Sequence, residues 1–270
     1  MAAPSLSVDV SGNPFVEVFF SSVAPGTSSL KIYRLSEDRQ WVVRGGIGIA
    51  TGVAALDFEA PFQTPATYRA EQFDALGNSL GFTDSATTSV DYAGTVVHNP
   101  LVPASLWASM HITGDSVAPL VRPTDGEMVY VEGAPVGKWI GTRRQGLRDV
   151  EVSLETQTLA DANRVQAMLG TYETQQVGVL CIRTSARIRW PRTFFARGDL
   201  SEKELNVRFG GELVRFDSRM DEVEPPFPGL VTPLLTYDDL DAFGNYTAQD
   251  AGWLTYTDRD RAYELAGLSG

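Results

Sequence analysis

Cysteine and histidine, which supply many catalytic and metal-binding groups, are scarce in this chain of 270 residues. It has one cysteine, Cys181, and two histidines, His98 and His111. A lone cysteine excludes an intramolecular disulfide and a cysteine-based zinc site. Because Cys181 lies in the apolar run of residues 177–182, we expect a buried and unreactive thiol. The sequence shows no catalytic cluster, so we expect a protein that is not an enzyme and holds no cofactor or metal.

Positive charge and long apolar runs are scarce as well. The 22 Lys and Arg residues face 34 Asp and Glu residues, which gives a formal net charge of −12. A general nucleic-acid binder needs a basic face to displace counterions, so we expect no nucleic-acid partner. No apolar run approaches the roughly 20 residues that span a bilayer. The first residues lack the basic region and apolar core of a secretory signal, so we expect synthesis in a cytoplasm.

Short strands with alternating apolar residues are common in residues 1–94, and turn sequences such as Ser11-Gly12-Asn13-Pro14 separate them. About seven such strands predict an immunoglobulin-like β-sandwich. Residues 67–79 resemble the late strands of fibronectin type III domains, and the absence of a cysteine pair favours that type over the antibody type. The expected strands are residues 6–10, 15–20, 29–33, 41–44, 55–59, 68–73 and 85–90.

Residues 95–227 contain the one well-patterned helix of the chain. Thr158 and Asp161 have the spacing of a helix-capping box, apolar residues then recur at helical spacing, and Gly170 stands where a left-handed cap belongs. Strands flank this helix, which predicts an α+β domain, split-barrel-like and mostly antiparallel, with one covering helix. The expected strands are residues 109–113, 128–131, 138–140, 150–154, 177–182, 187–190, 204–209 and 212–216.

Residues 228–270 follow a stiff proline-rich linker at residues 224–229. Leu235-Thr236-Tyr237-Asp238-Asp239-Leu240-Asp241 recurs in part as Leu254-Thr255-Tyr256-Thr257-Asp258-Arg259-Asp260. In both copies the threonine can cap a helix. We therefore expect a C-terminal extension with two short helices that pack on another surface.

Three motifs have simpler explanations. Gly77-Asn78-Ser79-Leu80-Gly81 fits a hydrolase nucleophile elbow around Ser79, but strands on both sides favour a hairpin turn. The glycines of residues 45–52 lack the spacing of a phosphate loop and indicate a glycine-rich strand or bulge. Residues 239–250 resemble a calcium loop, but Phe243 stands at a ligand position and Asp250 replaces the usual bidentate Glu. Helix caps explain the acidic residues equally well, and calcium binding stays open.

Arginines make the second domain locally basic within an acidic chain. Trp190 and Phe194 could stack on nucleic acid but can equally be core residues. A solvated face or a contact with acidic surfaces of a neighbouring subunit explains the arginines better. The arginines are Arg143, Arg144, Arg148, Arg183, Arg187, Arg189, Arg192 and Arg197.

Several stretches taken together resemble minor tail and distal tail proteins of long-tailed bacteriophages, especially those of actinobacterial hosts. They are His98-Asn99-Pro100-Leu101, Arg144-Gln145-Gly146-Leu147-Arg148, the strand–helix–strand unit with Cys181-Ile182-Arg183 and Trp190-Pro191, Asp221-Glu222-Val223-Glu224-Pro225-Pro226, and the Thr236–Leu240 unit. The resemblance covers residues 97–270, and an immunoglobulin-like domain also suits that family.

What the resemblance implies is a structural protein of the virion tail tip, whose β domain forms a ring. Its partners would be copies of itself, as a hexamer or trimer, together with tail tube, tape measure and tip proteins, and a host surface glycan is possible. The expected assembly interface contains Arg183, Arg187, Arg189, Tyr237 and Tyr256. Two other hypotheses stay open: a carbohydrate-binding adhesion module that uses Trp41, Trp107 or Trp139, and an esterase-like hydrolase that uses Ser79.

Overall fold

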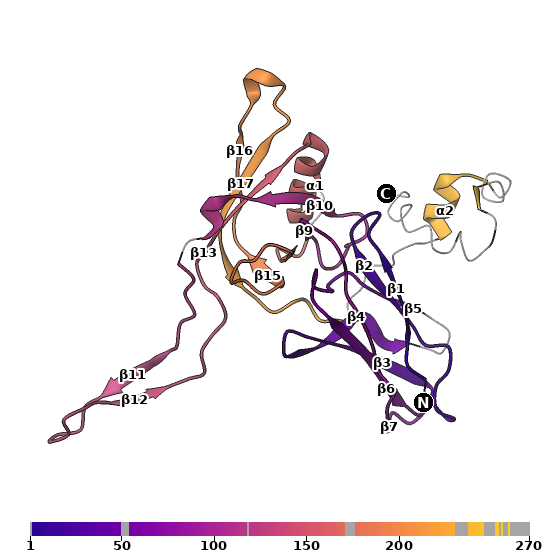
Figure 1. Cartoon of the computed structure of the whole chain (residues 1–270), viewed down its shortest axis with the longest axis horizontal. Helices are drawn as coiled ribbons and strands as arrows, with labels where there is room; N and C mark the ends of the chain where they lie inside the picture. Colours follow the sequence, from indigo (N-terminus) through magenta and orange to yellow (C-terminus); the bar gives the residue numbers. More distant parts are fainter. Residues whose placement is uncertain are drawn as a thin grey trace.

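A computed structural model describes residues 2–49, 54–117, 119–170, 176–229 and 237–245, and also residues 252, 253, 255 and 259. The fold is mainly β, as the sequence predicts. Its parts are an N-terminal β-sandwich, an antiparallel barrel with one covering helix, a projecting hairpin, and a short C-terminal helix (Figure 1). None of the helices in the described part of the chain is long and apolar enough to cross a membrane.

The sandwich packs a three-stranded sheet of order β1-β2-β5 against a sheet of order β4-β3-β6-β7. The short β8 also belongs to the second sheet, because it pairs with the first residues of β6, whereas β7 pairs with its last residues. The fourth strand pairs with the third rather than joining the first sheet, unlike the constant-type immunoglobulin arrangement. Inward-facing residues such as Val16, Ile32 and Tyr68 form its core. The strands are β1 (Ser5–Asp9), β2 (Phe15–Phe19), β3 (Ser29–Ser36), β4 (Arg39–Ile49), β5 (Ala54–Asp57), β6 (Ala66–Phe73), β7 (Ser79–Phe82) and β8 (Ala86–Thr88).

Two local features of the sandwich differ from a regular strand pattern. The glycine-rich segment is part of β4, where Gly45 and Gly48 have φ values of 71° and 73° and the ladder to β3 is irregular, so the predicted bulge is confirmed. At the edge of this sheet, β7 directly follows the Asp74–Asn78 turn and pairs with the second half of β6, where the sequence predicts no strand. The sequence instead predicts a strand at residues 85–90, of which only the short β8 forms.

The barrel closes because its first and last strands in the sheet order pair with each other. The order is β13-β10-β9-β14-β15-β17, and β17 pairs with β13 from Val150↔Met220 to Thr156↔Val214. Its strands are β9 (Thr95–His98), β10 (Trp107–Ile112), β13 (Val150–Thr156), β14 (Leu180–Thr184), β15 (Thr193–Arg197) and β17 (Val214–Glu222), with β16 (Ser201–Glu204) outside on β17. Two 3₁₀ turns, Gly114–Val117 and Val207–Phe209, complete this part of the chain.

The predicted helix is confirmed as α1 (Leu159–Leu169). The backbone N–H of Asp161 donates to Thr158 Oγ1 at 3.1 Å, which caps the helix start. Ala162, Val165 and Met168 are buried against the barrel, mainly on β10. Gly170 ends the helix with a φ of 94° but an extended ψ, so it is not the left-handed cap that the sequence predicts.

Residues 187–190 form no strand, contrary to the sequence prediction. They lie in the loop between β14 and β15, where Arg192 Nη1 donates to the carbonyl of Ala186 at 2.6 Å. Trp190 turns inward and packs on Phe194, with 5.5 Å between the ring centroids. The apparent alternation is therefore a loop in which the buried Trp190 follows two exposed arginines, Arg187 and Arg189.

The sandwich and the barrel share a packed junction. Val96 of β9 belongs to the sandwich core, while its neighbour Val97 belongs to the barrel core. Thr193 Oγ1 donates to the carbonyl of Glu59 at 2.9 Å. The proline-rich linker also docks on the sandwich, because the Arg44 guanidinium donates to the carbonyls of Pro226 and Phe227.

The C-terminal extension is described only in part. One helix, α2 (Tyr237–Phe243), forms where the first Thr-Tyr unit predicts it, and Phe243 packs on Trp253 at a centroid distance of 4.9 Å. Most of the second unit, Tyr256 included, lies outside the described residues.

Candidate assembly surface

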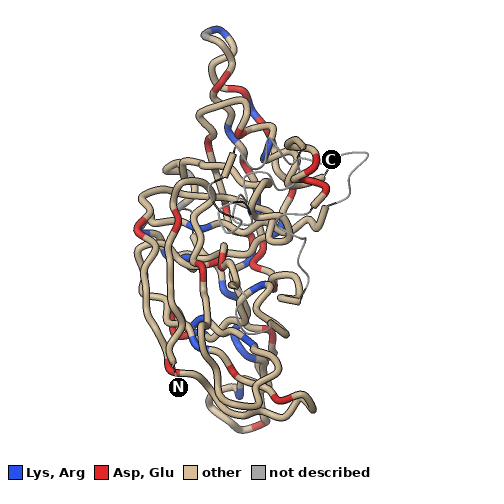
Figure 2. Tube along the Cα trace, turned by 90° about the vertical axis from the view of Figure 1, so that its right-hand side faces the viewer, with Lys and Arg blue, Asp and Glu red and all other residues tan. Residues whose placement is uncertain are grey.

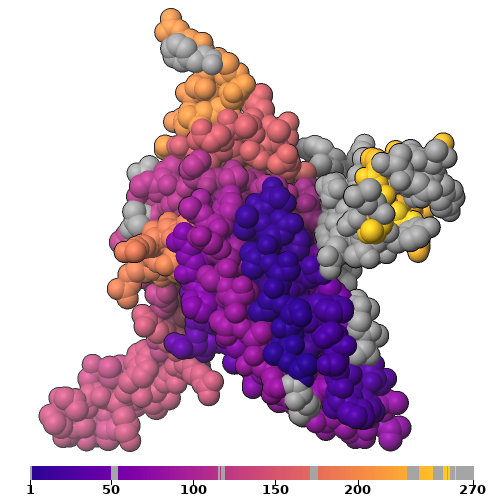
Figure 3. All heavy atoms as spheres, turned by 45° about the vertical axis from the view of Figure 1, so that its right-hand side comes forward, coloured from indigo at the N-terminus to yellow at the C-terminus, as the bar shows by residue number. Residues whose placement is uncertain are grey.

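A two-stranded hairpin stands clear of the barrel and carries the largest group of exposed apolar residues in the described part of the chain. We define the arm as residues 121–148; its strands are β11 (Gly126–Val129) and β12 (Lys138–Gly141), paired from Gly126↔Gly141 to Val129↔Lys138. Figures 1 and 3 show the arm projecting away from the body. It is the pink lobe at the lower left of Figure 3.

The arm continues as a ribbon down to the barrel wall. The Thr142 N–H donates to the carbonyl of Asp125 at 2.8 Å, and the Gln145 N–H donates to that of Pro123 at 2.9 Å. A final bridge joins Val121 to Arg148, two residues before β13 begins. Because both limbs are paired along the stem, the arm has a defined exit direction from the barrel.

One face of the arm is apolar and lies in solvent. Met128, Tyr130 and Trp139 are 48%, 75% and 49% exposed. The glycines of the arm make room for these side chains: a Cβ at Gly141 would lie 2.5 Å from Trp139 Nε1, and one at Gly137 would lie 2.7 Å from Met128 Cγ. Val121, Val131, Val136 and Ile140 are exposed as well.

Isolated two-stranded hairpins are marginally stable in water, and contiguous exposed apolar surface marks interaction sites. In the described part of the chain, β11 and β12 contact each other and pack extensively on no other strand or helix. The arm is therefore the strongest candidate for a surface that a partner covers.

Arg183 is the first of the three arginines that the sequence predicts at the assembly interface. It is fully buried between the sandwich and the barrel. Its guanidinium donates to the Ala60 carbonyl at 3.2 Å and to the Asn13 side chain, and stacks over Phe62 at 4.6 Å. Arg183 therefore cannot contact a neighbouring subunit in this fold. It fastens the two domains of one chain, which corrects the sequence prediction.

The other predicted interface residues lie apart from the arm face. Arg187 and Arg189 are exposed in the loop between β14 and β15, and Tyr237 is 80% exposed on α2. Tyr256 lies outside the described residues. The apolar face of the arm is absent from the predicted interface. The apolar stretches of residues 128–131 and 139–140, separated by Gly133 and Pro135, are a signal that could have found it.

Buried charges gather at the junction of sandwich and barrel. Arg34 pairs with Asp57 at 2.7 Å, and Arg44 pairs with Glu59 at 2.8 Å. Burial raises the pKa of Glu59, and the neighbouring arginines offset this only in part. Burial also lowers the pKa of Arg183 to about 10. Perturbed groups of this kind accompany active sites, but structural ion pairs perturb pKa values in the same way.

Cys181 and His98 are both buried at this junction. Burial raises the pKa of the Cys181 thiol, which keeps it protonated and matches the predicted unreactive cysteine. Burial, with a further contribution from Arg183, holds the pKa of His98 well below its ordinary range. His98 is therefore neutral in the folded protein at neutral pH.

Replacement of His98 by Gln is expected to make the free energy of unfolding fall less steeply as the pH drops from 7.5 to 5.5. The unfolded chain protonates His98 near pH 6.5, whereas the folded chain does not, so the unfolded state binds more protons below that pH. The free energy of unfolding should then fall by about 1 kcal/mol from this group between pH 6.5 and 5.5. Denaturant unfolding of both proteins at pH 7.5, 6.5 and 5.5 measures the difference in slope.

The matched control is His111→Gln, because His111 is exposed on β10. This variant should keep the slope of the unchanged protein. Equal slopes for the unchanged protein and His98→Gln would show that His98 is protonated in the folded state.

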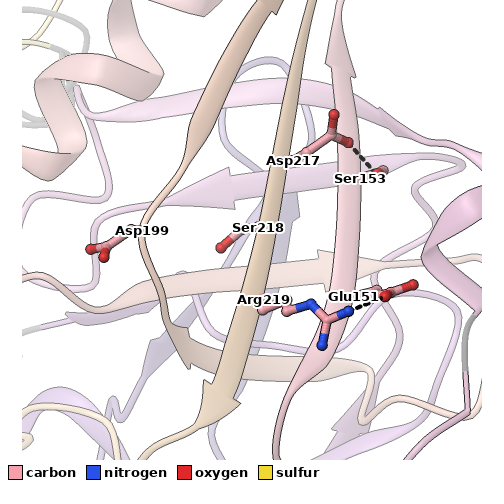
Figure 4. A pocket seen from close by; sticks show the side chains of 6 residues that line it. All are labelled: Glu151, Ser153, Asp199, Asp217, Ser218 and Arg219. Atoms are coloured by element: carbon pink, nitrogen blue, oxygen red, sulfur yellow. Dashed lines mark hydrogen bonds and ion pairs between the residues drawn. The ribbon is translucent and has the colours of Figure 1, made fainter.

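A polar depression of about 540 Å³ lies on the outer wall of the barrel beside β13 and β17. Figure 4 shows Ser153 pointing to Asp217 and Arg219 pointing to Glu151. Both pairs are direct neighbours in the β13–β17 register, so they are cross-strand pairs of a sheet surface. Asp199 and Ser218 complete the lining.

The catalytic and metal hypotheses gain nothing from the geometry. The hydroxyl of Ser79 donates to Glu71 Oε1 at 2.7 Å at the start of β7, and Asp74 accepts the N–H groups of Leu76 and Asn78 at 2.8 Å. The segment is thus a β-hairpin turn, as predicted. Over the described residues, no group of three or more His, Cys, Asp or Glu side chains is placed to hold a metal, and residues 246–250 of the candidate calcium loop lie outside them.

The three tryptophans considered for sugar binding have different surroundings. Trp41 packs on Phe195 at the junction, with ring centroids 6.1 Å apart, and Trp139 belongs to the arm. Trp107 borders a groove of about 560 Å³ between the sandwich and the barrel. Phe15, Phe58, Asp9 and Glu17 are among the other lining residues.

No protein-family model matches this chain, and no curated protein or solved structure matches it either.

Proposed function

We propose that this protein is a structural component of a bacteriophage tail tip, a ring-forming minor or distal tail protein. In this role it joins the tail tube to the tip or host-attachment apparatus and is part of the virion. Its partners are copies of itself, as a hexamer or trimer, and neighbouring tail proteins. The sequence resemblance of residues 97–270 suggests the family, and the apolar arm is the observation that supports a role in assembly.

An assembly role explains why the arm exposes its apolar face. In a monomer, Met128, Tyr130 and Trp139 stay in water and the hairpin gains little from its own contacts. In an oligomer they become buried, and each apolar side chain of this size stabilises the contact by about 1.5–3 kcal/mol. The binding free energy then adds to the stability of the folded arm.

The mass of the purified full-length chain in solution tests this proposal. We expect sedimentation equilibrium to give a closed homo-oligomer at micromolar concentration, since interfaces of stable oligomers are commonly apolar at their centre. A strict monomer at all accessible concentrations would contradict a self-assembling ring.

A carbohydrate-binding module is the second candidate, and the groove beside Trp107 is the observation that favours it. Aromatic rings and acidic side chains line this groove, and such concave amphipathic surfaces bind small polar ligands. However, the Arg164 guanidinium lies over the Trp107 ring at 5.8 Å, so one face of the indole is already in use. A monomer that binds glycans through Trp107 would favour this function over assembly.

A further inference from the structure

Four arginines surround a pocket of about 460 Å³ at the base of the arm. Arg122 and Arg144 come from the two limbs of the arm, and Arg187 and Arg189 come from the loop between β14 and β15. Arg122 Nη2 donates to the carbonyl of Arg189 at 3.3 Å, which ties the arm to the loop. We call this site the four-arginine pocket; Leu120, Ile188 and Trp190 complete its lining.

The arginines of this pocket have no acidic partner among the described residues, whereas arginines such as Arg215 and Arg219 on the barrel wall are paired. Arg215 binds Glu155 at 2.6 Å, and Arg219 binds Asp149 and Glu151 at 2.8 Å. Arginine is suited to bidentate binding of carboxylates. Four unneutralised guanidinium groups around one concavity, in a chain of net charge −12, therefore indicate a site for an anionic ligand.

The apolar part of the lining shows what else the ligand must carry. Trp190 is buried and packs on Phe194, so it forms a rigid wall of the pocket, and Leu120 and Ile188 add aliphatic surface. An inorganic anion would leave this surface uncovered. An acidic peptide that also presents aromatic side chains matches both parts of the lining.

We propose that the four-arginine pocket binds helix α2 of a second copy of this chain. Residues 237–245 contain three aspartates and no lysine, arginine or histidine. Asp238 and Asp241 are exposed and lie three residues apart, which places them on the same side of the helix. The exposed ring of Tyr237, four residues before Asp241, lies on the same side of the helix. In Figure 2 the acidic stretches of this segment are red.

The position of α2 requires the contact to be between two copies. Figure 1 shows α2 and the arm on opposite sides of the molecule, so the α2 of one chain lies apart from the pocket at the base of its own arm. A contact between two different surfaces is head-to-tail, and repetition of such a contact closes a ring when the rotation permits. This inference rests on the proposed self-assembly and adds the residues that make one of its contacts.

The arm tip is the other acidic and apolar segment that could enter a neighbour's pocket. Residues 126–141 hold Glu127 and Glu132 but also Lys138, so they are less negative than residues 237–245 with their three aspartates. Charge complementarity therefore favours α2.

A charge-swap experiment on the full-length chain tests the proposal. The pocket variant carries Arg187→Glu and Arg189→Glu, and the helix variant carries Asp238→Arg and Asp241→Arg. Each should associate at least about 100-fold more weakly than the unchanged chain, because attraction becomes repulsion at two charge pairs. An equimolar mixture should associate again, since the acidic helix of one variant meets the basic pocket of the other. Sedimentation velocity measures the association, and far-ultraviolet circular dichroism checks the fold.

The matched control is Arg197→Glu with Arg208→Glu, two exposed arginines outside the pocket. It should associate like the unchanged chain and show that added negative charge alone has no effect. Association of the pocket variant at full strength would overturn the proposal. Weakening by the pocket variant but not by the helix variant would overturn α2 as the occupant and favour the arm tip. In both cases the unchanged chain still forms its oligomer, whereas a monomeric unchanged chain would refute the proposed self-assembly itself.

Discussion

The triple variant Met128→Thr, Tyr130→Thr and Trp139→Thr is expected to remain folded and to associate about a thousand-fold more weakly. Threonine keeps a high preference for β-strands, so the hairpin itself should persist. Loss of an aromatic or other large apolar side chain from the centre of an interface commonly costs about 2 kcal/mol or more. Even about 4 kcal/mol for the three together corresponds to three orders of magnitude in Kd. Sedimentation equilibrium over a wide concentration range measures this change.

The arm variant has a control on the sandwich. Leu76 is 87% exposed in the turn between β6 and β7, so Leu76→Thr removes an exposed apolar residue outside the arm. This variant should leave the oligomer unchanged. Thermal unfolding of the triple variant under conditions where both proteins are monomeric should match that of the unchanged chain, because β11 and β12 support few contacts in the body. An oligomer of undiminished strength in the triple variant would refute the assembly role of this face.

Helices and strands that are specified by local features of their own residues could be predicted from the sequence. Helix α1 is one, because its cap at Thr158 and its buried positions at Ala162, Val165 and Met168 are local features. Strand β9 is the opposite case, since all four of its residues are buried and its sequence shows no alternation. Its two sides meet different cores, with Val96 in the sandwich and Val97 in the barrel. Only the packing of the two domains explains why both faces are buried.

The candidate site depended even more on contacts that are remote in sequence. Arg183 resembles its surface neighbours Arg187 and Arg189, yet it is buried because Asn13 and Ala60, 170 and 123 residues away, surround its guanidinium. The strands of the arm were predicted, but their exposure was not, since exposure depends on which elements lie nearby. For the same reason the sequence could not predict that Arg122 and Arg144 lie beside the β14–β15 loop.

Replacement of Asp57 by Ala is expected to lower the free energy of unfolding by about 3–5 kcal/mol. Both Asp57 oxygens accept from Arg34 Nη1, at 2.8 and 2.7 Å, and Oδ2 also accepts from the Tyr68 hydroxyl at 2.8 Å. Arg34, Asp57 and Tyr68 are all buried, so the variant leaves a buried guanidinium and a buried hydroxyl without their acceptor. A loss of this size is a large part of the 5–15 kcal/mol that usually stabilises a folded domain. Denaturant unfolding monitored by tryptophan fluorescence measures it.

Two further variants separate the loss of a buried partner from the loss of a charge pair as such. Glu151→Ala breaks one exposed pair of Arg219 and should cost at most about 1 kcal/mol, because water screens both groups. The double variant Arg34→Met with Asp57→Leu removes both buried charges and should cost less than Asp57→Ala alone, since no uncompensated charge remains. A double variant less stable than Asp57→Ala would mean that Arg34 stabilises the sandwich through something other than Asp57, and its stacking over Trp41 at 6.0 Å is the contact to test next.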